Sequence, residues 1–309
     1  MKKLKEFLVN ALKGFGIGTA MIIPGVSGGT LALILGIYEK LIYAISHFFR
    51  KFKESFVFLL AILIGAAVAF LALSHVISYC LASFLFATVM FFFGAVIGGL
   101  PMLFSHVKGA QIRTSYIVIA VITAAVVIGL LFTGEGSNVD LTTIGFGKFI
   151  SLILIGAVTA ATMVIPGVSG SAFLMTIGYY TPVLNEVKAL TSHGGNIGHS
   201  ALVIAPFAVG VLLGIFFIAK LIEWLFKKFE VQTYWGIIGF VIASAVVIII
   251  QNFFKLDGQW ASIGQVLQGT SVLEYIVGAA LAVIGFFLAY KLGDNDKDRK
   301  SVPDVENLD

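Results

Sequence analysis

Residues 20–38 read AMIIPGVSGGTLALILGIY, and residues 162–180 read TMVIPGVSGSAFLMTIGYY. Both stretches carry the run IPGVSG, in which a proline, two glycines and a serine interrupt otherwise apolar sequence. Proline ends the helix that precedes it, and glycine permits the sharp reversal that follows. Irregular backbone at membrane depth is tolerated only where it is buried in protein or lines a wet cavity. The repeated motif therefore predicts two broken helices at functional positions of a membrane protein.

The composition supports a membrane-embedded helical fold. The chain has 309 residues, of which 59% are hydrophobic and only 12% charged, with a mean hydropathy of +1.03. Apolar segments lie near 56–80, 86–104, 114–133, 200–226, 231–252 and 271–290. Each is close to the roughly 20 residues with which a helix crosses a bilayer. We expect an all-α polytopic membrane protein. The basic residues flank these segments, so we expect no nucleic-acid partner.

The two halves of the chain repeat one another. The motif alignment pairs Pro24 with Pro166, and the match continues through three later pairs: Gly65 with Gly210, Thr88 with Thr233, and Gly94 with Gly239. Internal duplication is typical of transporter folds. We expect a first repeat over 1–133, with a hairpin at 7–45, and a linker at 134–144 outside the cytoplasm. A second repeat would cover 145–292, with a hairpin near 147–182, followed by a disordered cytoplasmic tail at 293–309.

The distribution of charge indicates how the repeats are oriented. If each motif forms a re-entrant helical hairpin beside three transmembrane helices, the second repeat is inverted relative to the first. Of the 20 Lys and Arg residues, only Lys148, Lys188 and Lys255 then fall outside, and Lys220 lies within a span. If each motif segment crosses the membrane instead, this bias nearly vanishes. The positive-inside rule favours the hairpins, with both termini in the cytoplasm.

The residues after each proline form a candidate anion site. A serine followed by glycines suits the start of a new helix, whose free N–H groups and positive dipole end attract anions. Two inverted hairpins would bring two such helix starts together near the membrane midplane. Pro24 and Pro166 turn the chain, and the expected phosphate-binding residues are Gly25, Ser27, Gly28, Gly29, Thr30, Gly167, Ser169, Gly170 and Ser171. The alternative is that proline and glycine only kink packed helices.

Few ionisable groups lie within the apolar segments. Lys220 and Glu223 share one helix face, because they are three residues apart. Lys220 is a candidate counter-charge for phosphate, and Glu223 and His75 are candidates for proton coupling. The alternative for Lys220 is that its ammonium only reaches the cytoplasmic lipid headgroups. The alternative for His75 is a packing role.

The paired motif, MIIPGVSGGTLALILGIYEKLI with TMVIPGVSGSAFLMTIGYY, resembles the PopT-type polyprenyl-phosphate transporter family of bacteria. The resemblance extends from about Phe7 to Lys291. It implies a non-enzymatic flippase in the cytoplasmic membrane that returns undecaprenyl phosphate from the outer to the inner leaflet, without a cofactor or metal. It also implies that the lipid carrier is recycled for peptidoglycan and other envelope polymers. The second copy departs from the first at Ser171-Ala172, so the two hairpins would contribute unequally.

Two other functions stay open at this point. A secondary transporter of a small soluble anion could use the same helix starts. A membrane lipid phosphatase is disfavoured, since no histidine follows PGVSG and no nucleophile with a base is evident. The sequence leaves proton coupling and a homo-oligomer undecided.

Overall fold

The computed structural model describes residues 2–22, 27–132, 136–168, 170–191, 196–256 and 259–297. In the first half the helices are α1 (Lys2–Met21), α2 (Gly28–Ile34), α3 (Tyr38–Ser46), α4 (Phe52–Ser83), α5 (Leu85–His106) and α6 (Thr114–Phe132). The second half contains α7 (Phe146–Val164), α8 (Gly170–Thr176), α9 (Tyr180–Thr191), α10 (Ile197–Phe253), α11 (Ile263–Val266) and α12 (Val272–Lys297). Two antiparallel two-residue strands, β1 (Lys255–Leu256) and β2 (Gln259–Trp260), follow α10.

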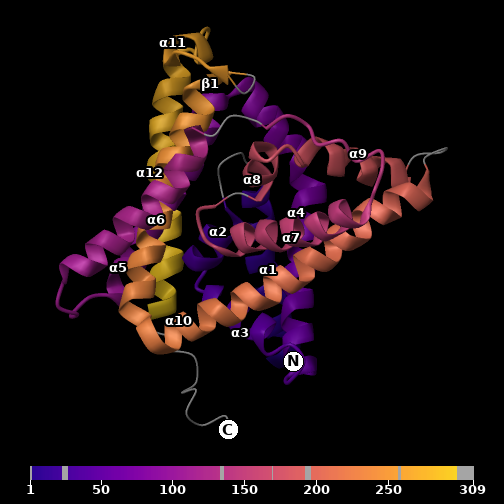
Figure 1. Cartoon of the computed structure of the whole chain (residues 1–309). Coiled ribbons are helices and arrows are strands. Elements are labelled where there is room, and N and C mark those ends of the chain that lie inside the picture. Colours follow the sequence, from indigo (N-terminus) through magenta and orange to yellow (C-terminus); the bar gives the residue numbers. More distant parts are fainter. Residues whose placement is uncertain are drawn as a thin grey trace.

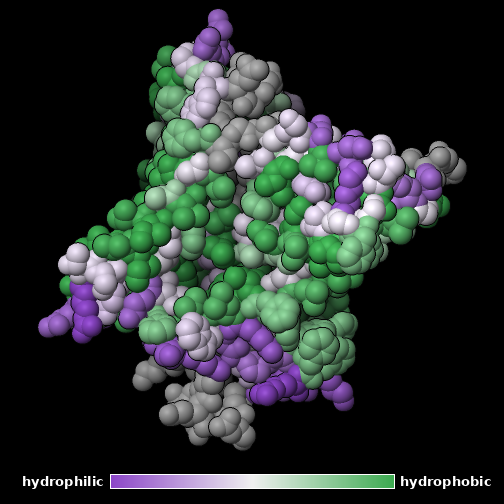
Figure 2. Space-filling view, in the orientation of Figure 1, coloured by the Kyte–Doolittle hydropathy of each residue, from purple (hydrophilic) through white to green (hydrophobic). Residues whose placement is uncertain are grey.

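Six of these helices are long and apolar enough to cross a membrane, namely α4, α5, α6, α7, α10 and α12. Their outer faces carry large apolar side chains: Leu71 is 77% exposed and Leu212 is 68% exposed. Figure 2 shows apolar residues over the long helices and hydrophilic residues gathered toward the ends of the molecule. A surface of this kind is stable in lipid rather than in water. The protein is therefore a multi-pass helical membrane protein, as predicted.

Helix α10 contains two of the predicted apolar segments. The segments 200–226 and 231–252 form its two parts, which meet at a bend, and the second part turns toward α11 (Figure 1). Phe229 has non-helical torsion angles (φ −138°, ψ 49°) at the bend. Phe84, between α4 and α5, has almost the same angles (φ −140°, ψ 54°). The hydroxyls of Thr88 and Thr233 donate to the carbonyls of Phe84 and Phe229, each at 2.8 Å. The aligned threonines thus occupy equivalent turns.

Close glycine contacts also repeat between the halves. Gly65 of α4 packs against the Ala11 carbonyl of α1, and the aligned Gly210 of α10 packs against the Ile153 carbonyl of α7. A Cβ atom at either glycine would overlap the facing backbone. Small residues permit such close helix approach within membranes. The duplication in the sequence therefore corresponds to duplicated helix packing.

Each half also packs its last helix on the other half. α12 lies along α5, where Gly94 faces the Ala282 carbonyl, and α6 lies along α10, where Gly239 faces the Ala120 carbonyl. The hydroxyl of Thr123 in α6 donates to the Gly236 carbonyl at 2.9 Å. The two halves are consequently interlocked rather than being separate domains.

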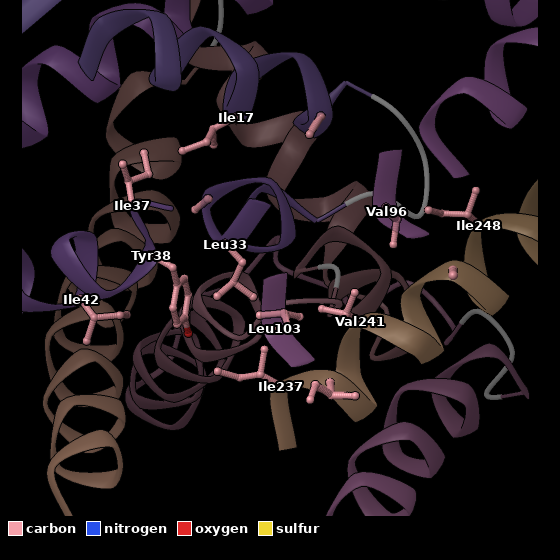
Figure 3. Close-up of a cluster of buried hydrophobic side chains, with 14 of the residues drawn as sticks. Ile17, Leu33, Ile37, Tyr38, Ile42, Val96, Leu103, Ile237, Val241 and Ile248 are labelled. Atoms are coloured by element: carbon pink, nitrogen blue, oxygen red, sulfur yellow. The ribbon is translucent and has the colours of Figure 1, made fainter. Parts of the chain in front are cut away.

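The short helices of the first half lie at the centre of the largest apolar core. α2 and α3 meet at an angle of 115°. Figure 3 shows Leu33 and Tyr38 from this segment near Leu103 of α5 and Ile237 of α10, with Ile42 on the other side of Tyr38. Tyr38 and Ile42 are 3% and 1% exposed. The motif region is thus held by helices from both halves.

The linker and tail were expected at 134–144 and 293–309. Within the linker, the N–H groups of Gly136 and Val139 donate to the carbonyls of Met175 and Gly178, at 3.1 and 3.0 Å. The linker therefore packs along the end of α8. Helix α12 continues to Lys297, so the expected start of the tail at Gly293 is too early. Residues 298–309 lie outside the described residues.

Candidate functional site

The short helices α2 and α8 end in the same way. Gly36 and the aligned Gly178 have positive φ angles of 62° and 74°. Their N–H groups donate to the carbonyls of Leu33 and Met175, at 2.8 and 3.1 Å. Glycine adopts this left-handed conformation without the steric cost that a Cβ brings. The Nζ atom of Lys13 also donates to the Leu35 carbonyl at 2.7 Å, which places a cation at the C-terminal end of α2.

The start of α2 presents buried polar groups. Ser27 is extended (φ −93°, ψ 132°) at the N-cap position, 6% exposed, and its hydroxyl makes no capping hydrogen bond. Its carbonyl accepts from the N–H groups of Thr30 and Leu31 at 3.0 and 3.3 Å. The Thr30 hydroxyl is fully buried and has no hydrogen-bond partner among the described residues. Buried hydroxyls are normally hydrogen-bonded, so an unpaired one is unusual.

The two motifs lie against each other. A Cβ atom on Gly29 would be 3.2 Å from the Val164 carbonyl oxygen and 3.3 Å from the Pro166 Cα atom. The Tyr38 hydroxyl donates to the same Val164 carbonyl at 3.2 Å. A Cβ atom at position 29 would require the facing backbone of the second motif to shift by a few tenths of an ångström. The structure therefore brings together Gly29 and Pro166, from motifs far apart in the chain.

The second motif packs against α10. Pro166 is fully buried, and Gly167 has a φ of 84° with its Cα atom facing the Phe240 carbonyl. Gly170 is buried against the Met163 side chain, whereas Ser171 is exposed. Gly28, in the first motif, is partly buried against Ile17 and Met21. The predicted residues Pro24, Gly25 and Ser169 lie outside the described residues.

A groove of about 610 Å³ extends from the second motif to the surface, between α6 and the two parts of α10. Ile165, Pro166 and Tyr38 line its inner part. Its walls are largely apolar and are formed by residues such as Ile119, Ile218, Leu221, Ile222, Leu225, Ile237 and Phe240. Leu221, which lines the groove, is 48% exposed. It lies on the apolar outer surface that faces lipid. An apolar channel that reaches both lipid and the motif suits an amphipathic ligand.

One cation lines this groove. Arg113 precedes α6, is exposed, and shares the groove with the polar side chains of Tyr116, Gln232 and Thr233. Phe229, at the bend of α10, lines the same part. A guanidinium binds phosphate through paired hydrogen bonds, and its charge does not depend on pH in the physiological range. The groove therefore combines an apolar wall with a group suited to phosphate.

The predicted residues Lys220 and Glu223 are not in this groove. They line a second cavity of about 490 Å³, together with Ser46, His47, Arg50 and Lys227, which includes none of the motif residues. Glu223 lies 2.8 Å from the Lys227 Nζ atom and 3.5 Å from the His47 Nδ1 atom. His75 is exposed on α4 and lines neither cavity.

Sequence reasoning missed several of these residues. Arg113 was not among the predicted site residues, because Gln232 and Thr233, which line the same groove, come from the other half of the chain. His47 and Arg50 lie more than 160 positions before Glu223, and no periodicity links them. Tyr38 could have been found from the sequence, because the repeat places a tyrosine, Tyr180, at the corresponding position of the second half.

Comparisons with known proteins identify the family of this chain. Residues 17–259 match a protein family described as undecaprenyl phosphate translocase-like. The chain is 32% identical over 295 residues to a polyprenyl-phosphate transporter of Staphylococcus aureus, covering 92% of this chain and 95% of the relative. It is 25% identical over 260 residues to a polyprenyl-phosphate transporter of Vibrio cholerae, covering 78% and 77%. No solved structure matches the chain.

Proposed function

The chain belongs to the undecaprenyl phosphate translocase-like family, and we propose that it moves undecaprenyl phosphate across the bacterial cytoplasmic membrane. Transport runs from the outer to the inner leaflet and recycles the carrier for peptidoglycan and other envelope polymers. The relatives named polyprenyl-phosphate transporter support a lipid-phosphate substrate. The observation that carries the proposal is the apolar groove that joins Pro166 of the second motif to Arg113.

The phosphate binds where the two motifs meet. The contact between Gly29 and Pro166, with the unpaired Thr30 hydroxyl nearby on α2, supports this position. Ser27, Gly28, Gly29 and Thr30 contribute hydroxyl and N–H groups from the first hairpin. The second hairpin contributes the region of Gly167, Gly170 and Ser171, and Gly25 and Ser169 complete the proposed set. Donors that are already oriented bind phosphate without a further ordering cost.

Arg113 guides the phosphate along the groove, while the isoprenoid chain remains among the apolar residues of α6 and α10. The groove of about 610 Å³ opens beside exposed Leu221, so the rest of the chain extends into lipid. This division keeps the charged headgroup away from hydrocarbon, where an unpaired charge is costly. The headgroup therefore crosses within the protein while the isoprenoid tail stays in contact with lipid.

The two halves form an inverted repeat, and their hairpins expose the headgroup site alternately to the two leaflets. The matching torsion angles at Phe84 and Phe229 and the equivalent packing of Gly65 and Gly210 support a structural duplication. The distribution of Lys and Arg supports a cytoplasmic location of both termini. Such repeats commonly rock against each other around a central site.

Proton coupling is assigned to Glu223 rather than to His75. Glu223 is close to two groups that respond to its charge, His47 and Lys227, whereas His75 has no such partner among the described residues. A group that couples protons to transport needs neighbours whose arrangement changes with its charge. Replacing Glu223 with Gln should remove the dependence of transport on a proton gradient.

A carrier of a small soluble anion is the alternative function. It would use the same donors but would have no need for a long apolar groove that reaches the lipid-facing surface. Binding of undecaprenyl phosphate, undecaprenol and inorganic phosphate to the purified protein separates the two. We expect undecaprenyl phosphate to bind at least about tenfold more tightly than either of the others, because only it fills both the groove and the phosphate site. Preferential binding of inorganic phosphate would favour the soluble-anion carrier.

A further inference from the structure

The second cavity lies between the end of α3 and the first part of α10. Ser46 is the last residue of α3, and His47 and Arg50 come from the turn that follows. Lys220, Glu223 and Lys227 come from successive turns of α10. Its volume of about 490 Å³ is comparable with that of the groove. None of its residues lines the groove, so the two spaces are distinct.

The cavity carries an excess of positive charge. Lys227 is paired with Glu223, whose side chain is 14% exposed. Arg50 and Lys220 have no carboxylate within ion-pair distance among the described residues. The ammonium of Lys220 lies 4.5 Å from the centre of the Phe216 ring, which holds it beside the cavity. The cavity therefore has two cations, Arg50 and Lys220, that no carboxylate of the described residues compensates.

Aromatic side chains form the outer wall of the cavity. Phe49 is 79% exposed, and Trp224 is 48% exposed, one turn of α10 beyond Lys220. The rings of Phe49 and Phe216 are 5.8 Å apart and meet edge to face. Aromatic residues beside basic residues are typical of the interface between lipid headgroups and hydrocarbon. The cavity thus combines cations with exposed aromatic rings, an arrangement suited to a charged lipid headgroup.

We propose that this cavity is a second binding site for the phosphate monoester of the lipid substrate, where the lipid is held before or after it passes through the groove. The inference rests on the proposed function, because it takes polyprenyl phosphate as the substrate. Arg50 and Lys220 bind the phosphate, Ser46 lies within the same cavity, and the tail passes over Phe49 and Phe216.

Charge favours the monoester over an ordinary anionic phospholipid. A phosphate monoester carries about −1.5 to −2 charges at pH 7, because its second pKa is about 6. A phosphodiester headgroup such as that of phosphatidylglycerol carries a single negative charge. Two uncompensated cations match the monoester more closely, and an exposed aromatic wall favours a lipid over inorganic phosphate.

Photo-crosslinking tests this site directly. A benzoylphenylalanine residue replaces Phe49 in the full chain, which is reconstituted into vesicles that contain undecaprenyl phosphate. We expect crosslinking to undecaprenyl phosphate, reduced about tenfold when Arg50→Gln and Lys220→Gln are combined, since two charge-assisted contacts are lost. Lys108→Gln is the control, because it also removes an exposed cation but lines neither the cavity nor the groove. It should leave crosslinking unchanged.

Competition identifies the ligand. Excess phosphatidylglycerol or inorganic phosphate should displace undecaprenyl phosphate only weakly. Equal crosslinking to phosphatidylglycerol, or full displacement by inorganic phosphate, would overturn the assignment to a lipid monoester. Unchanged crosslinking in the double variant would overturn it as well.

Translocation by the same vesicles separates this inference from the proposed function. Wild-type transport without crosslinking at position 49 would contradict the second site and leave the proposed function intact. Specific crosslinking without any transport would support the second site and contradict the translocase function.

Discussion

Phe84, between α4 and α5, and Phe229, within α10, bend the chain at corresponding points of the two halves. Their torsion angles differ by only a few degrees, and the aligned Thr88 and Thr233 make the same hydrogen bond. Their surroundings differ in charge. Beside Phe84, the Glu274 carboxylate of α12 accepts from the Phe86 N–H at 3.1 Å, whereas Phe229 shares a groove with Arg113.

This difference distinguishes the backbone that both halves share for packing from the charged residues that only one half has. Duplication repeats the backbone and its glycine contacts, which both halves need in order to pack. At one bend the Glu274 carboxylate accepts a hydrogen bond from the protein backbone. At the other bend the Arg113 guanidinium lines an open groove. Changes to the shared backbone should therefore affect stability, and changes to the unshared charges should affect transport separately.

The largest effect is expected at the glycines that end α8 and α2. Gly178→Ala should lower the free energy of unfolding by about 2–4 kcal/mol, because a left-handed alanine is strained and its Cβ would overlap the Ser137 carbonyl. Gly36→Ala should cost about 1–2 kcal/mol from the positive φ. Thermal unfolding in detergent provides the comparison. Gly109→Ala, with a φ of 93° and open space around it, isolates the backbone cost. Equal stability of Gly178→Ala and wild type would contradict the packing of the linker on α8.

Exchanging the charges beside the two bends should have the next largest effect. Arg113→Gln should slow undecaprenyl phosphate transport about tenfold without changing the unfolding temperature, because it removes a phosphate contact at the surface. Glu274→Gln should instead lower the free energy of unfolding by about 1 kcal/mol, since a neutral acceptor replaces a charged one. Lys108→Gln, which removes an exposed cation that does not line the groove, serves as the control. If Arg113→Gln transports normally, the groove is not the substrate path.

A change at Thr30 tests whether the two motifs contribute unequally to phosphate binding, because the second motif has Ala172 at the corresponding position. Thr30→Val removes an unpaired buried hydroxyl and nearly preserves its volume. The free energy of unfolding should stay the same or rise by up to about 1 kcal/mol, because an unpaired buried hydroxyl is removed. Transport should slow about threefold, because the hydroxyl contacts the phosphate in the proposed site. Parallel measurements of unfolding and translocation separate the two effects. Faster transport by Thr30→Val would exclude the hydroxyl from the site.

The smallest effect is expected at His75, which lies on the exposed face of α4. His75→Gln should change transport by less than about twofold at any pH between 6 and 8, because surface substitutions away from a site rarely matter. A pH series of translocation rates checks this. A shifted pH profile would return His75 to the transport pathway as a coupling group.

Much of the scaffold could be predicted from the sequence. Apolar segments of bilayer length correspond to the long helices α4, α5, α6, α10 and α12, whereas α7 was expected only as part of a hairpin. Pairs such as Gly65 with Gly210 occur at equivalent contacts, because close helix packing requires small residues at fixed spacing. The bend at Phe229 falls between the predicted segments 200–226 and 231–252, although Phe229 is neither proline nor glycine. The expected meeting of the two motifs corresponds to one contact in the structure. Gly29 and Pro166 do meet, but Lys220 lies in another cavity, because sequence spacing along one helix does not reveal which helix faces it.

Movement of undecaprenyl phosphate between leaflets is the measurement that tests the central claim most directly. The purified protein is reconstituted into vesicles with undecaprenyl phosphate, and the lipid in the outer leaflet is followed with a reagent that cannot cross the membrane. We predict rapid exchange of the lipid with wild-type protein, about tenfold slower exchange with Arg113→Gln, and none in protein-free vesicles. Exchange no faster than in protein-free vesicles, together with uptake of soluble phosphate, would contradict the proposed function.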